Sequence, residues 1–191
     1  MNTFTLTLKP AIELTEDQFF HLCQNNQDAR FERSASGELI VMPPTGGETS
    51  RRNAKITASL IHWTESIGSG VAFDSSGGFL LPNGANRSPD ASWINQFRWD
   101  ALQPEQKEKF VPLCPDFVIE LMSPSDSLPP AQAKMREYID NGTRLGWLIN
   151  RSAKTVEVYR TDQAVELLHA PTALHGEPVL DGFKLSLASI W

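Results

Sequence analysis

Two acidic residues and one lysine are the residues of this sequence best suited to chemistry. Asp90 follows Pro89 in an extended segment, Glu120 lies inside the apolar run 117–122, and Lys134 follows on a segment with helical spacing. Burying a carboxylate in an apolar run is costly unless a cation or hydrogen-bond donor pairs with it. Converging carboxylates bind hard divalent cations such as Mg²⁺, and a nearby lysine orients an attacking water or stabilises transition-state charge. The three residues form a minimal set for metal-dependent phosphodiester hydrolysis.

The spacing around Lys134 predicts that its side chain faces the interior. Ala131, Lys134, Met135 and Tyr138 stand at positions i, i+3, i+4 and i+7 of one helix face. An inward lysine usually has a carboxylate partner, and Glu120 on the preceding strand is the candidate. Alternatively, the lysine stem covers apolar surface while its ammonium reaches solvent. We expect Lys134 to meet Glu120 across the gap between strand and helix.

Two further acids have both a functional and a structural interpretation. Asp116 lies four residues before Glu120, so both point to one face of the strand, and Asp116 either supports the site or simply begins the strand. Glu48 begins a long predicted helix, where a carboxylate complements the helix dipole. Its functional alternative is a further metal ligand from across the cleft.

Three segments carry the signals of larger helices. Thr15 and Gln18 form a capping-box pattern at the start of a helix over about 15–26. A helix over about 130–141 follows the segment of Glu120. A long helix is predicted over 48–67, because apolar residues recur at helical spacing on one face, at Ile56, Leu60, Trp63 and Ile67.

The predicted strands form a mixed sheet. Segment 116–122 is apolar on both faces and predicts a central strand, whereas the alternation of 155–160 predicts a half-exposed edge strand. The polar stretch 97–113 resembles an insertion with one short surface helix. The other predicted strands are a hairpin over 30–42, a meander of 71–74, 78–81 and 90–94, a strand at 145–149, and short strands within 165–191. This order predicts an α/β sandwich around a mixed central sheet flanked by helices.

Composition limits the classes of protein that remain. The chain of 191 residues is 40% apolar and 21% charged, which favours a single domain over 1–191. The net charge of −6 gives no global attraction for nucleic acid, so a local basic patch or metal ions would have to supply it. Cys23 and Cys114 are too few for a disulfide framework, which favours a reducing, cytoplasmic setting. The beginning lacks signal-peptide features and no long apolar run occurs, so we expect neither export nor a membrane span.

Basic residues lie near the acids in the sequence. Arg51, Arg52 and Lys55 cluster at the start of the long predicted helix, and Arg87 comes just before Asp90. They predict a rim that contacts the phosphates of a nucleic acid. The alternative is an ordinary solvated helix face, which is the more frequent origin of such clusters.

Several motifs together resemble one known family. The segments PDFVIELMSPS from Pro115, KMREYIDNG from Lys134 and LGWLI from Leu145 resemble the Uma2 family (DUF820) of restriction endonucleases. The resemblance covers nearly the whole chain from about residue 10, including the segments that begin at Pro44, Gly78 and Leu180. It implies a single domain with the restriction-endonuclease-like αβββαβ core of the PD-(D/E)XK superfamily, Mg²⁺ or Mn²⁺ as cofactor, and duplex DNA as substrate.

The resemblance also assigns roles to residues. Asp90 resembles the first metal-binding aspartate of the superfamily, and Glu120 resembles the acid of its (D/E)XK half. Met122 stands where that pattern has lysine, and the resemblance implies that Lys134 has taken over from the following helix. The lesser candidates are Gln132 and Glu48, the latter resembling the acid of the first core helix.

Other functions stay open at this level. A protein that lost the strand lysine could be a binding or assembly module that keeps the nuclease fold without cutting. A two-carboxylate glycosidase uses similar acids but needs no lysine. A homodimer is a further hypothesis, with contacts through the predicted edge strand ending at Arg160 and through Ile190 and Trp191, since many nucleases use two sites for two strands.

Overall fold

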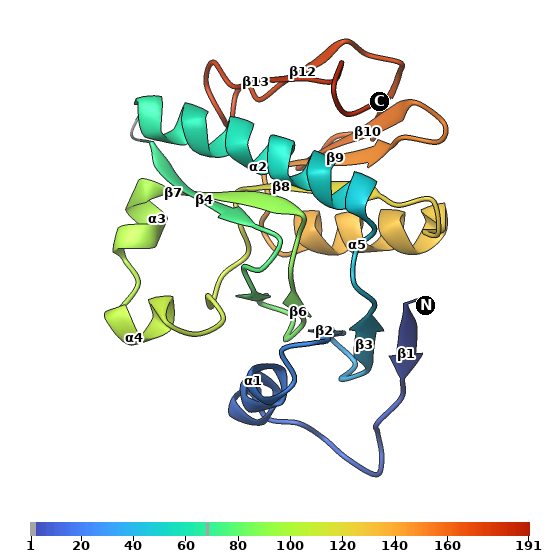
Figure 1. Ribbon diagram of the computed structural model, residues 1–191. Coiled ribbons are helices and arrows are strands. Elements are labelled where there is room, and N and C mark those ends of the chain that lie inside the picture. Colours follow the sequence, from blue (N-terminus) through green and yellow to red (C-terminus); the bar gives the residue numbers. More distant parts are fainter. Residues whose placement is uncertain (1–2, 68) are drawn as a thin grey trace.

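The central element of the fold is a six-stranded mixed sheet with the strand order β11-β10-β9-β8-β7-β4 (Figure 1). The structure is a computed structural model that describes residues 3–67 and 69–191. Strands β8 and β9 pair in parallel, while the other neighbours pair antiparallel. The strands are β4 (Gly70–Asp74), β7 (Ala91–Asn95), β8 (Phe117–Met122), β9 (Leu145–Asn150), β10 (Thr155–Arg160) and β11 (Glu166–His169).

Two helices, α2 (Gly47–Ile67) and α5 (Leu128–Asp140), cover opposite faces of this sheet (Figure 1). Alternate side chains of β8 point to opposite faces. Phe117, Ile119 and Leu121 therefore pack with α2, whereas Val118 and Met122 pack with α5. The order α2-β4-β7-β8-α5-β9 is the expected αβββαβ core, with additional elements between its strands.

A second sheet from the N-terminal half has the strand order β1-β3-β2-β6-β5 and lies below the central sheet in Figure 1. Its centre is the predicted hairpin of β2 and β3, in which Gly37 takes a φ of 88° at the turn. Helix α1 (Glu16–Asn25) begins with the predicted capping box. The strands are β1 (Phe4–Leu6), β2 (Arg30–Arg33), β3 (Leu39–Met42), β5 (Phe79–Leu80) and β6 (Asn86–Arg87).

The remaining elements are short. Helices α3 (Gln96–Asp100) and α4 (Pro104–Lys107) lie between β7 and β8, and a hairpin of β12 (Ala173–His175) and β13 (Lys184–Ser186) follows the central sheet. Within the described residues, every helix is too short or too polar to cross a bilayer.

Two predictions about the elements were wrong. Segments 71–74 and 78–81 belong to different sheets, because β4 pairs with β7 and β5 pairs with the unpredicted β6. Strand β10 is no edge, since β11 pairs with its outer side. The long helix predicted over 48–67 is confirmed as α2, and its last apolar residue, Ile67, is 53% exposed.

Candidate active site

Asp90 and Glu120 lie opposite each other on neighbouring strands. Ala91 of β7 pairs with Ile119 of β8 in antiparallel register, which places the preceding residue, Asp90, across from Glu120. The Asp90 carboxylate accepts a hydrogen bond from the backbone N–H of Leu121 at 2.8 Å. Its other oxygen accepts one from Nδ2 of Asn53, on helix α2, at 2.6 Å. Backbone and helix together hold Asp90 beside Glu120.

Lys134 reaches this pair from helix α5. Its Nζ lies 2.8 Å from Oε1 of Glu120, so the predicted contact across the gap between strand and helix is confirmed. Met122, on the same face of β8, is buried in the apolar cluster under α5. The strand position that the family pattern gives to a lysine is thus part of the core, and the lysine beside Glu120 comes from the helix.

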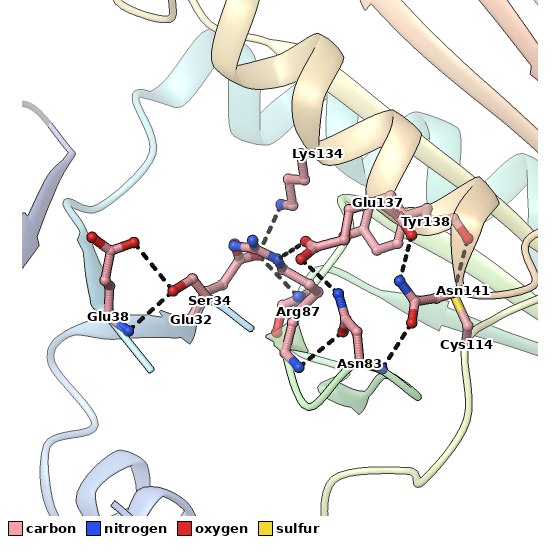
Figure 2. Close-up of polar contacts among 12 residues, drawn as sticks. Glu32, Ser34, Glu38, Asn83, Arg87, Cys114, Lys134, Glu137, Tyr138 and Asn141 are labelled. Carbon is pink, nitrogen blue, oxygen red and sulfur yellow. Dashed lines mark hydrogen bonds and ion pairs between the residues drawn. The ribbon is translucent and has the colours of Figure 1, made fainter. Parts of the chain in front are cut away.

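A third carboxylate, Glu32 of β2, completes the surroundings of Lys134. Its Oε1 lies 2.8 Å from the same Nζ atom, and its side chain is 3% exposed. Figure 2 shows the lysine pointing from α5 toward this glutamate. The other Glu32 oxygen pairs with Arg87 at 3.0 Å, and Arg87 in turn pairs with Glu137 of α5 at 2.6 Å. The N-terminal sheet is therefore joined to the core through buried ion pairs.

The electrostatics distinguish the carboxylates of this group. Burial, with the charges of Asp90 and Glu32 adding to it, raises the pKa of Glu120 to about 7, although Lys134 opposes the shift. Burial also raises the pKa of Asp90, against the hydrogen bonds that its carboxylate accepts and the charge of Lys134. Burial acts on Glu32 as well, but Lys134 and Arg87 outweigh it and lower the pKa of Glu32. Glu32 thus stays ionised at neutral pH, whereas the charge of Lys134 does not offset the effect of burial on Asp90 and Glu120.

The same charges act on Lys134. Although burial alone would lower its pKa, the carboxylates of Glu120 and Glu32 raise it above the ordinary lysine value. Lys134 is therefore a cation at neutral pH, suited to stabilise negative charge and unsuited to act as a base. Tyr138, one turn further along α5, donates a hydrogen bond from its hydroxyl to Oε1 of Glu120 at 3.0 Å.

The carboxylates of Asp90 and Glu120 are suited to hold a divalent ion whose other ligands come from water and substrate. Within 3–67 and 69–191, no group of three or more His, Cys, Asp or Glu side chains converges on a single metal position. Mg²⁺, however, is commonly held by one or two carboxylates together with waters and substrate phosphates. The described contacts of Glu120 all fall on Oε1, and each Asp90 oxygen accepts one hydrogen bond, so both carboxylates keep free lone pairs. Burial raises the pKa of both acids, and a bound cation would favour their ionised forms.

Asp116 and Gln132, both expected to support the site, have partners elsewhere. Asp116, at the start of β8, accepts the backbone N–H of Asn95 at 2.9 Å and pairs with Arg98 at 2.9 Å. Four residues of strand separate it from Glu120 by about 13 Å. It therefore supports the beginning of the strand, which was the structural alternative. Gln132 donates to Oε1 of Glu157 on β10 at 2.7 Å.

Glu48 lies in the first turn of α2 and pairs with arginines of its own helix. Its side chain is 66% exposed and contacts Arg51 at 3.1 Å and also Arg52. Hydrogen bonds from these two arginines lower the pKa of Glu48 to about 2. These contacts match its structural alternative, and the role of Glu48 as a metal ligand stays a prediction.

The four basic residues predicted to contact DNA fall into two groups. Arg51 and Lys55 are exposed on α2. Arg52 is buried and donates to the backbone oxygens of Ile190 and Glu48. The Arg87 side chain is 10% exposed and is held by its two glutamates. Arg51 and Lys55 are thus exposed where phosphates could reach them, although Arg51 also pairs with Glu48. Arg52 and Arg87 are instead held by structural partners.

The surface proposed for a homodimer has to be corrected. Strand β10 is covered by β11, and the side chain of Ile190 is 1% exposed within the core. Trp191 is half-buried and donates from its indole N–H to the backbone oxygen of Pro171. These residues stabilise the subunit itself, and dimerisation stays a prediction without a defined surface.

Glu32, Asn53 and Tyr138 are neighbours of the site that the sequence did not reveal. Glu32 lies in a four-residue strand of the second sheet, and only the tertiary fold brings it to Lys134. Asn53 shares helix α2 with Glu48 but lies more than one turn further along it. Tyr138 carried a usable signal, because it stands at i+4 from Lys134 on the inward face.

The αβββαβ core that the resemblance implied is present, and it brings two strand acids and a lysine together. A family model, Uma2, described as "Putative restriction endonuclease", matches residues 16–188. The chain therefore belongs to the Uma2 family, as its motifs predicted.

Comparison with solved structures supports the same fold. A protein of Anabaena variabilis, described as "a putative nuclease belonging to DUF820", superposes with a TM-score of 0.73. The two sequences are 23% identical over 93% of this chain and 97% of that chain. At this identity the likeness concerns the fold. No curated protein matches the sequence.

Proposed function

We propose that this protein is a Mg²⁺-dependent endonuclease that hydrolyses phosphodiester bonds of duplex DNA, with Mn²⁺ able to replace Mg²⁺. The observation that carries the proposal is the contact of 2.8 Å between Lys134 and Glu120, directly beside Asp90, in a chain of a nuclease family. Asp90 and Glu120 are the proposed metal ligands, and Lys134 is the proposed catalytic lysine. The cytoplasm is the proposed location.

Each residue has a distinct role in this proposal. A divalent ion bound by the two acids would polarise the scissile phosphate and lower the pKa of an attacking water. Asp90 is fixed by Asn53 and the Leu121 backbone, so it presents its carboxylate without rearrangement. Lys134 has three N–H donors, of which two point at Glu120 and Glu32. The third can donate to a phosphate oxygen and stabilise the charge that develops there.

Binding of duplex DNA is proposed through its backbone. The net charge of −6 opposes non-specific attraction, so contacts must be local. Arg51 and Lys55 are exposed on the helix that also carries Asn53, the partner of Asp90, and they are the proposed phosphate contacts. Arg52 and Arg87 would act indirectly, since both are held by internal partners.

Incubation with supercoiled plasmid tests the proposal. We expect the purified protein to nick the plasmid with Mg²⁺ or Mn²⁺ and to be inactive with EDTA. Glu120→Gln and Lys134→Ala should each lower the rate about 100-fold or more, because each removes a group that acts on the transition state. Asp116→Asn is the matched control, and we expect it to retain activity.

The alternative, a non-catalytic binding or assembly module, predicts a different outcome. It is favoured if the wild-type protein shows no nicking, or if Glu120→Gln and Lys134→Ala nick as fast as the wild type. The same set of proteins therefore decides between an enzyme and a binding module.

A further inference from the structure

We propose that Glu32 is a positioning residue that holds Lys134 in place while Glu120 binds the metal ion. This inference rests on the proposed nuclease function and adds to the site a residue from outside the αβββαβ core. Glu32 belongs to β2 of the N-terminal sheet, whereas Glu120 and Lys134 belong to β8 and α5 of the core. The active site would then be completed by two sheets.

The geometry shows Lys134 held between two carboxylates. Its Nζ lies 2.8 Å from Oε1 of Glu32 and 2.8 Å from Oε1 of Glu120, which approach from different sheets. A lysine side chain has four rotatable bonds and loses considerable entropy when it is fixed. Two charged acceptors within hydrogen-bond distance hold the ammonium group in one position. A single acceptor would leave the ammonium group free to rotate around that one contact.

Glu120 alone is unsuited to hold the lysine during catalysis. In the proposed reaction its carboxylate would also hold a divalent ion, and the charge of that ion would weaken the attraction between Glu120 and Lys134. Glu32 faces no such competition, because its second oxygen is taken by Arg87 at 3.0 Å and its first also accepts the backbone N–H of Ser88 at 3.0 Å. These contacts anchor Glu32 independently of the metal ion.

The contacts of Arg87 allow the positioning of Lys134 by Glu32 to be tested separately from the contribution of Glu32 to stability. Arg87 bridges two carboxylates, Glu32 and Glu137, and Figure 2 shows Glu137 on the same helix as Lys134. Loss of either carboxylate leaves Arg87 with one partner. Loss of Glu32 also removes a partner of Lys134, whereas loss of Glu137 does not. The two glutamates therefore form a matched pair for an experiment.

The experiment compares Glu32→Gln with Glu137→Gln. Both changes are isosteric, and both leave every cation of the network with a carboxylate, so we expect both variants to fold. In plasmid nicking, Glu32→Gln should lower kcat roughly 10- to 100-fold with little change in KM, as is usual for partners that orient catalytic groups. Glu137→Gln should keep the wild-type kcat.

A second measurement does not depend on activity. NMR relaxation of the Lys134 side-chain Cε group should show an ordered methylene in the wild type and in Glu137→Gln, and a more mobile one in Glu32→Gln. Equal kcat values and equal mobility in the two variants would overturn the proposal, as would losses of kcat that merely follow losses of thermal stability. If the wild type shows no nicking, the proposed nuclease function fails, and the mobility comparison still decides whether Glu32 holds Lys134.

Discussion

Asp90 and Asp116 follow the same local pattern but lie in different electrostatic surroundings. Each comes directly after a proline and before a strand of the central sheet. Each accepts a hydrogen bond from a backbone N–H of the neighbouring strand, Asp90 from Leu121 at 2.8 Å and Asp116 from Asn95 at 2.9 Å. Local sequence and backbone geometry therefore do not distinguish them.

Their second carboxylate oxygens do distinguish them. Oδ1 of Asp116 pairs with the guanidinium of Arg98 at 2.9 Å, so its charge is balanced. Oδ1 of Asp90 accepts only the neutral amide of Asn53 among the described contacts, and the carboxylate of Glu120 lies across the strand from it. A carboxylate paired directly with a cation stabilises the fold, whereas one without such a pair keeps capacity for a bound cation. Asp90 is therefore distinguished from Asp116 by having no directly paired cation among the described contacts, rather than by its Pro-Asp motif.

The largest expected effect is on activity. Asp90→Asn should lower plasmid nicking about 100-fold or more, because a neutral amide is a poor ligand for Mg²⁺. Asp116→Asn should nick at the wild-type rate when the two proteins are compared at equal concentrations of folded protein. Initial rates of loss of supercoiled plasmid measure both. Equal losses of nicking activity in the two variants would contradict the functional difference between Asp90 and Asp116.

The next effect is the pH dependence of the site. Because burial and neighbouring carboxylates raise the pKa of Glu120 to about 7, part of this group is protonated below pH 7 and cannot bind a cation. At limiting Mg²⁺, the nicking rate should therefore rise with pH through about 7. Higher Mg²⁺ should move the midpoint to lower pH, since the ion favours the ionised form. A flat pH profile at limiting Mg²⁺ would contradict this.

The two variants should rank in the opposite order for stability: Asp116→Asn should lose more stability than Asp90→Asn. Asp116→Asn breaks the pair with the half-exposed Arg98 and should lower the free energy of unfolding by about 1–2 kcal/mol. The raised pKa of Asp90 means that its ionised form is disfavoured in the folded chain relative to the unfolded one. Above that pKa, Asp90→Asn removes this cost and should leave stability unchanged or raise it. Urea unfolding at neutral pH measures both variants, and a larger loss for Asp90→Asn would reverse the order.

The smallest effect is expected from Tyr138→Phe. The change removes the hydrogen bond from the Tyr138 hydroxyl to Glu120 and should cost about 0.5–1.5 kcal/mol of stability, with less than about a tenfold loss of nicking. The hydroxyl favours the ionised carboxylate, so its removal should move the pH midpoint of nicking upward. The pH profile of the variant checks this, and a downward shift would contradict it.

The core of the site could be predicted because its signals are local. Glu120 stands in an apolar run, and helical spacing places Lys134 on the inward face of the next element, so their contact follows from one strand-helix unit. The order of the elements predicted an α/β sandwich around a mixed sheet, and the resemblance to the family implied its αβββαβ core. Strand β8 and helix α5 needed no long-range information.

The rest of the site depends on contacts between distant segments. Glu32 meets Lys134 across about a hundred residues, and nothing in the alternation of its strand distinguishes it from an ordinary hairpin residue. The division of β4 and β5 between two sheets depends likewise on which partner each strand finds. Strand β10 was predicted as an edge because its pattern alternates, but β11 comes from a segment with weak strand signals.

Titration calorimetry with Mn²⁺, as a stand-in for Mg²⁺, tests most directly whether Asp90 and Glu120 form a cation site. The wild-type protein and Asp116→Asn should bind the ion with the same affinity, and Asp90→Asn and Glu120→Gln should lose that binding. Equal binding by the wild type and Asp90→Asn, or no binding by the wild type with plasmid DNA present, would contradict the account.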